Sequence, residues 1–132
     1  MGERRLFALR VTKSSWGIEV DLEAKAHVGS PPPRDALRAG GRTSLYVLDP
    51  LDRGYRRALL DGLRHVAADI EQAVPDAMVV VEVQGLDYSP ADCPAVAFTA
   101  AMIGWAADEY GLGEPAYTVD FDEAANRYVF TF

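Results

Sequence analysis

The stretch Ala77-Met-Val-Val-Val-Glu-Val-Gln84 and the uncharged segment at 93–107 determine the fold. The first is a β-branched apolar run, short enough to be a strand that is buried on most of both faces. Residues 85–92 hold Gly, Ser, Pro and Asp and predict a loop. The Ala-rich sequence that follows predicts a helix over 95–110, which must be covered on most of its circumference because its first part carries no charge. This strand and this helix form the expected core.

The chain of 132 residues predicts one domain, 1–132, that is large enough for a core without disulfides or metal. Cys93 is the single cysteine, so an internal disulfide is excluded, and we expect a cytoplasmic location. The uncharged segment of 15 residues at 93–107 is shorter than the roughly 20 needed to cross a bilayer. We therefore expect no membrane association.

Charge is distributed unevenly along the chain. The formal net charge is −7, with +4 in residues 1–64 and −11 in residues 65–132. Neutralisation of phosphates supplies most non-specific affinity for nucleic acid, so RNA binding is disfavoured for a chain this acidic. A local basic face in the first half stays open as an alternative.

Alternation of apolar and charged residues predicts a sheet with one solvent-exposed face. Residues 18–26 alternate strictly and should pair as an antiparallel hairpin with a strand at 4–11. Residues 28–43 are rich in Pro and Gly and predict an irregular connection with a single helical turn at 34–39. A third strand is expected at 44–48. The wet side of the strand at 18–26 consists of Glu19, Asp21, Glu23 and Lys25.

A long amphipathic helix is expected at 51–73, with Asp49 as its N-cap. Gly62 lies on its apolar side and predicts a close approach to the sheet. Alternating runs at 117–121 and 128–132 predict a closing hairpin. The helix's apolar stripe comprises Tyr55, Leu59, Leu63, Val66, Ile70 and Val74.

The predicted element order is β-β-β-α-β-α-β-β. We expect an α+β protein with a two-layer α/β sandwich, in which two helices cover one face of a mostly antiparallel sheet.

Three groups of residues carry a resemblance to a known family. They are Tyr55, Gly62 and Pro75; then Tyr88, Asp92, Ala97 and Phe98; then Glu114, Pro115 and Asp122. With the element order, these residues resemble domain IV of bacterial elongation factor G, which also occurs in tetracycline ribosome-protection factors. The resemblance spans 10–122 and implies a ribosomal-protein-like fold in which Asp92 caps the second helix. It also implies two tip loops that reach the ribosomal decoding centre.

The chain departs from that family at both tip loops. Its first loop is Thr12-Lys-Ser-Ser-Trp-Gly17, two residues shorter than the family's Gly- and Arg-rich loop, and Ser89 stands where the family has His. The sequence contains no Gly-x-x-x-x-Gly-Lys-Ser/Thr loop, so GTP binding is not expected. Trp16 and Tyr88 are the expected anchors, because aromatic residues with few charges suit a protein contact. The candidate tip residues are Thr12, Lys13, Ser14, Ser15, Trp16, Gly17, Asp87, Tyr88 and Ser89.

Four helix arginines form a weaker candidate, a basic face for RNA phosphate. The competing interpretation is a solvated helix face on which the arginines alternate with Asp52 and Asp61. The four are Arg53, Arg56, Arg57 and Arg64.

Two further residues are expected to be inert. Cys93 follows the proposed cap Asp92, and a small tolerated side chain is favoured over a reactive thiol. His65 lies four residues from both Asp61 and Asp69, where a solvated face is favoured over a metal site. Neither a metal nor a cofactor is predicted.

The sequence favours a non-enzymatic binding module that contacts a protein or the ribosome through its tip loops. The alternative is an acidic protein-interaction or immunity-type regulatory protein that covers a basic partner. An enzyme ranks last, because no nucleophile–base pair or metal set is readable. A homodimer through the strand at 128–132 also stays open.

Overall fold

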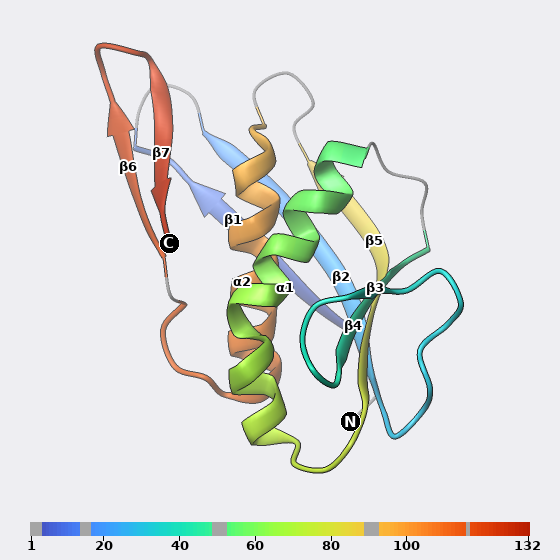
Figure 1. Cartoon of the computed structure of the whole chain (residues 1–132). Helices are drawn as coiled ribbons and strands as arrows, with labels where there is room; N and C mark the ends of the chain where they lie inside the picture. Colours follow the sequence, from blue (N-terminus) through green and yellow to red (C-terminus); the bar gives the residue numbers. More distant parts are fainter. Residues whose placement is uncertain (1–3, 14–16, 49–52, 89–92, 116) are drawn as a thin grey trace.

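The computed structural model describes residues 4–13, 17–48, 53–88, 93–115 and 117–132 (Figure 1). Its elements in chain order are β1 (Arg4–Val11), β2 (Ile18–Val28), β3 (Leu37–Arg38), β4 (Thr43–Val47), α1 (Arg53–Ala73), β5 (Val79–Tyr88), α2 (Ala95–Tyr110), β6 (Thr118–Asp122) and β7 (Arg127–Thr131). Neither helix in these ranges is long and apolar enough to cross a bilayer.

Five strands form the main sheet in the order β1-β2-β5-β4-β3. All its pairings are antiparallel except that of β4 with β5, which α1 connects. Strands β6 and β7 form a separate antiparallel hairpin, which projects beside the main sheet in Figure 1. The closing hairpin is thus confirmed, although it does not extend the main sheet.

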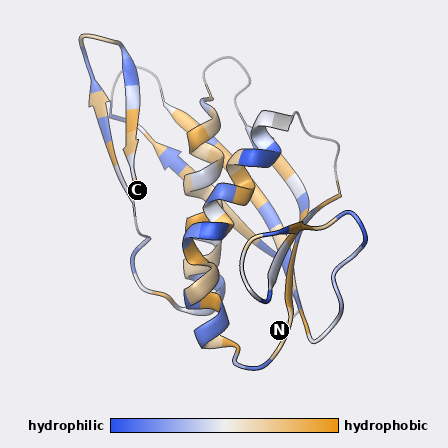
Figure 2. Ribbon diagram, viewed as in Figure 1, coloured by the Kyte–Doolittle hydropathy of each residue, from blue (hydrophilic) through white to orange (hydrophobic). Residues whose placement is uncertain are grey.

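Both helices lie on one face of the sheet, as predicted (Figure 1). The apolar side of β2 faces them, and Val20, Leu22 and Ala24 are fully buried. The alternate residues lie on the opposite, open face. There Arg10 lies 2.7 Å from Asp21, and Arg4 lies 3.1 Å from Glu23. Orange segments run along the strands behind the helices in Figure 2, and this side of the sheet holds the core.

The two helices make a close contact at Gly62. The prediction that Gly62 approaches the sheet is therefore wrong, because its neighbour is α2. A Cβ atom at Gly62 would lie 2.5 Å from the carbonyl oxygen of Thr99 on α2. The Thr99 hydroxyl in turn donates a hydrogen bond to the carbonyl oxygen of Ala58, at 2.8 Å. The glycine at which a helix meets the sheet is Gly104 of α2, against the ring of Phe7.

The helical turn expected at 34–39 is wrong. Residues Leu37–Arg38 form β3 instead, because Leu37 pairs with Leu45 of β4 and packs against the core. The Arg38 guanidinium holds the following bend by donating to the carbonyl oxygens of Gly40 and Gly41. Pairing with β4, six to eight residues further along the chain, therefore overrides the helical tendency of this segment.

Asp49 and Asp92, the residues predicted to cap the two helices, lie outside the described residues. Pro94 is the N-cap of α2, and no side chain caps this end by a hydrogen bond. At the other end Gly111 adopts the left-handed conformation, with φ 62°, and its N–H bonds to the carbonyl oxygen of Ala107. This αL C-cap is a common way to end a helix.

Arg42 secures the end of α1. Its guanidinium donates to the carbonyl oxygens of Glu71 and Val74, at 2.9 and 3.0 Å, and so satisfies helix-terminal acceptors. The Glu71 carboxylate accepts from the Arg42 backbone N–H at 2.9 Å and from the Thr43 hydroxyl at 2.7 Å. These two hydrogen bonds, helped by the charge of Arg42, lower the pKa of Glu71.

Candidate functional site at the tip

Three strands end together at one end of the main sheet, which we call the tip. Val20 of β2 pairs with Leu9 of β1 on one side and with Tyr88 of β5 on the other. The turn after β1 and the end of β5 are therefore neighbours. The candidate tip residues that the structure describes are Thr12, Lys13, Gly17, Asp87 and Tyr88. The others, Ser14, Ser15, Trp16 and Ser89, lie outside the described residues.

The second tip segment is strand where a loop was predicted. Strand β5 continues through Gly85 to Tyr88, so Asp87 and Tyr88 belong to the sheet. The pairing with β2 continues past a bulge in β5: Glu23 pairs with Gly85 and Ala24 with Val83, so Gln84 is the extra residue. The loop composition of 85–88 could not reveal this, since the pairing depends on the partner strand β2.

Tyr88 is a half-buried support of the tip rather than an exposed anchor. Its ring lies 4.9 Å from that of Phe98, which is fully buried, and 5.6 Å from that of Tyr55. Tyr55 and Phe98 are themselves 4.5 Å apart. Aromatic pairs at such separations stabilise beyond the area they bury. This cluster fixes the end of β5 on both helices.

The exposed described residues of the tip are Thr12, Lys13 and Asp87. Asp87 lies directly opposite Asp21 on the open face. Like charges facing each other across strands are destabilising, and the ion pair of Arg10 with Asp21 offsets this repulsion. The described part of the tip thus presents the cation Lys13 beside a partly compensated acidic patch.

The C-terminal hairpin also reaches the tip, which sequence reasoning missed. The backbone N–H of Lys13 donates to the Tyr128 hydroxyl oxygen at 3.0 Å. Tyr128 is buried and makes a T-shaped ring contact with Phe121, at 4.9 Å. A groove of about 750 Å³ separates residues 9–13 from residues 117–120. The alternating aromatic residues of β7 could have suggested that the hairpin packs on another part of the protein. They do not indicate which part.

The helix arginines do not form one continuous basic face. Arg57 and Arg64 lie 3.7 and 3.9 Å from the same carboxylate, that of Asp61. Arg56 instead turns toward a cavity beside β4. Arg53 begins α1, and its side chain is not among those described.

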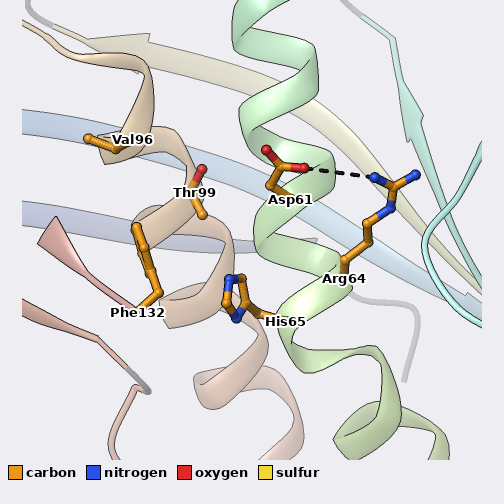
Figure 3. A pocket seen from close by; sticks show the side chains of 6 residues that line it. All are labelled: Asp61, Arg64, His65, Val96, Thr99 and Phe132. Carbon is orange, nitrogen blue, oxygen red and sulfur yellow. Dashed lines mark ion pairs between the residues drawn. The ribbon is translucent and has the colours of Figure 1, made fainter.

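Among the described side chains, His65 forms no ion pair with Asp61 or Asp69, the carboxylates four residues away on either side. Figure 3 shows it across a pocket from Phe132, and the two ring centroids are 5.5 Å apart. The pocket, of about 450 Å³, lies between the helices, and Asp61 on its wall pairs with Arg64. In the described ranges no three His, Cys, Asp or Glu side chains are grouped to hold a metal ion.

Cys93 is a poor nucleophile in this structure. Burial raises the pKa of its thiol to about 11. The thiolate is the reactive form, so very little of it exists near neutral pH. This agrees with the expectation of an inert side chain.

No protein-family model matches the chain, and no curated protein matches it in sequence. The resemblance to domain IV of elongation factor G remains a prediction from the residues quoted above.

Proposed function

We propose that this protein is a non-enzymatic binding module whose tip docks on a protein surface. The observation that carries the proposal is the convergence of the turn after β1, the end of β5 and the hairpin at one end of the sheet. A hydrogen bond from the Lys13 backbone N–H to the Tyr128 hydroxyl links the turn to the hairpin. Binding residues are often presented at the ends of elements that a rigid scaffold positions.

The chemistry of the tip favours a protein over RNA. Its described residues include one cation, Lys13, whereas RNA contacts favour several Arg or Lys side chains. On the helix, two of the candidate arginines share the carboxylate of Asp61, which weakens the basic-face interpretation. Trp16 stays a proposed anchor on the ground of sequence alone.

The family resemblance supports the ribosome as the setting in a cytoplasmic location. Sedimentation of the purified protein with purified ribosomes tests this point directly. We expect co-sedimentation that Trp16→Ala weakens, because a proposed aromatic anchor is lost, and that Asp69→Lys, an exposed change on α1, does not weaken. Absence of the protein from the ribosomal pellet would exclude the ribosome as its partner.

The alternative function is that of an acidic regulatory protein covering a basic partner. Glu19, Asp21 and Asp87 on the open face beside the tip favour it, together with the net charge of −7. Electrostatic attraction of this kind is screened by salt. Loss of partner binding at raised ionic strength would therefore favour the alternative over an aromatic tip contact.

A further inference from the structure

Strand β1 leaves one edge of the main sheet open. It stands first in the strand order β1-β2-β5-β4-β3, and its eight residues pair with β2 alone among the described elements. The strand at the opposite edge, β3, has two residues. A long edge strand presents a row of unpaired backbone N–H and C=O groups, which is a template for pairing with another strand. Of the described strands of the main sheet, β1 thus offers the long free edge.

Backbone hydrogen bonds show which residues of β1 face this edge. The N–H of Gly29, at the end of β2, donates to the carbonyl oxygen of Met78, which precedes β5. The backbone groups of successive strand residues point to opposite sides, so odd-numbered residues of β2 face β5 and even-numbered ones face β1. Because Phe7 pairs with an even-numbered residue of β2, its backbone bonds to β2. Its neighbours Leu6 and Ala8 consequently direct their N–H and C=O groups to the free edge.

The side chains along this edge combine an exposed apolar residue with compensated cations. Leu6 is 58% exposed, more than any other large apolar side chain of the described residues. Charged side chains on an edge strand normally protect it against pairing. Arg4 and Arg10 are instead drawn toward β2 by ion pairs with carboxylates of that strand, and Arg5 pairs with Glu109 of α2. The three cations are thus compensated within the chain, which reduces their repulsion of a strand of like charge.

The edge is complementary to itself in one antiparallel register. When Leu6 stands opposite Leu6 of a second copy, Arg4 faces Ala8 and Arg5 faces Phe7 of that copy. In this register no arginine of the strand faces another arginine. A shift by two residues in either direction places arginines directly opposite each other, which is destabilising. The sequence of the edge therefore favours a second copy of this chain, paired at Leu6.

We propose that the protein forms a homodimer in which β1 pairs antiparallel with β1 of a second copy, centred on Leu6. A two-fold axis then passes through the Leu6 pair, so each copy contributes the same surface. The two main sheets become continuous, and the exposed Leu6 side chains leave water together. Residues 117–120 flank β1 at residues 9–13, so the pairing uses residues 4–8 and leaves the tip free. The dimer is independent of the function proposed for the tip.

Sedimentation equilibrium and hydrogen exchange, measured from micromolar to millimolar protein, test the proposal. We expect a reversible monomer–dimer equilibrium. Exchange at the Leu6 and Ala8 amides should slow as the concentration rises, whereas exchange at Phe7, which is already bonded to β2, should change less. A protein that stays monomeric over the whole range would overturn the proposal.

Two variants assign the dimer to the β1 edge. Ala8→Pro removes an outward N–H without removing a bond to β2, and Leu6→Lys places two like charges opposite each other. Each should weaken dimerisation by roughly ten-fold or more. Leu48→Lys, an equally drastic change at an exposed leucine of another edge, is the matched control and should leave it unchanged. A dimer that survives Leu6→Lys but is lost in Val129→Lys would overturn the proposal and assign the contact to the hairpin.

Cross-linking tests the register, with Cys93 replaced by serine. In Leu6→Cys the two new thiols stand opposite each other, with Cα atoms about 5.5 Å apart, which is within the reach of a disulfide. Mild oxidation should therefore link this variant into covalent dimers. In Ala8→Cys the corresponding positions lie roughly 14 Å apart along the strands, so this control should not cross-link. Preferential cross-linking of Ala8→Cys would contradict the pairing at Leu6.

Discussion

The backbone N–H of Lys13 donates to the hydroxyl oxygen of Tyr128 at 3.0 Å, across 115 residues of sequence. This bond connects the turn after β1 to a hairpin that shares no strand pairing with the main sheet. A two-stranded hairpin alone is marginally stable in water, so it depends on such contacts.

Tyr128→Phe tests this connection. The variant keeps the ring but loses the hydroxyl, and we expect the free energy of unfolding to fall by about 0.5–1.5 kcal/mol. Hydrogen exchange at the Lys13 amide should become faster. Tyr128→Ala should cost more because the ring is buried. Unchanged exchange at Lys13 in Tyr128→Phe would show that the bond does not hold the tip.

Gly62→Ala tests the close contact between the helices. Alanine has the better helix propensity, by about 1 kcal/mol, yet its Cβ would meet the Thr99 carbonyl oxygen. Overpacking typically costs about 1–3 kcal/mol, so we expect net destabilisation in urea unfolding. Ala68→Gly on the exposed side of α1 is the control and should cost about 1 kcal/mol through propensity alone. A more stable Gly62→Ala protein would refute the contact.

Phe98→Ala should remove about 3–5 kcal/mol from the free energy of unfolding. The ring is fully buried and contacts both Tyr55 and Tyr88, so its loss leaves a cavity beneath the tip. Val96→Ala, two residues earlier and 41% exposed, should change stability by at most about 0.5 kcal/mol. Equal unfolding midpoints for the two variants would contradict the placement of Phe98.

The carboxylate of Glu71 should make stability depend on pH. Its folded-state pKa lies below the ordinary value of 4.5, mainly because of the hydrogen bond from the Arg42 backbone N–H. The unfolded chain therefore binds the proton more readily. The stabilisation is present above the unfolded pKa and is lost as pH falls through the folded one.

Urea unfolding of the wild type and of Glu71→Gln at neutral and acidic pH measures this effect. The wild type should be the more stable protein at neutral pH, and the difference should shrink as the pH falls below 4.5. The same neutralisation at exposed Glu114 is the control and should give a smaller difference at neutral pH. A stability difference that stays constant with pH would contradict the role of the carboxylate.

Local patterns predicted the elements that local physics determines. The strand at 4–11 and the helix at 95–110 were placed at the bounds observed, and the alternation in β2 identified its buried face. Strand β5 ended later than predicted, because its last residues pair with β2 beyond a bulge at Gln84. Pairing of Leu37 with Leu45, across a short connection, produced β3 where a helical turn was expected.

The tip was predictable in its position but not in its construction. Antiparallel pairing of β2 with both neighbours was enough to bring Thr12 and Tyr88 to the same end of the sheet. That the ring of Tyr88 packs inward on Phe98 depends on where the helices lie. The hydrogen bond from Lys13 to Tyr128 depends on where the hairpin docks. Neither feature has a periodic signature in the sequence.

Capture of a protein partner by the immobilised protein at raised salt tests the role of the tip most directly. Wild type, Trp16→Ala and the Asp69→Lys control should first be shown to unfold at comparable urea concentrations. We predict that one defined protein is retained by the wild type and the control and is lost with Trp16→Ala. Retention of RNA that is sensitive to salt and nuclease, that ignores Trp16→Ala and that fails when the α1 arginines are replaced would contradict the account.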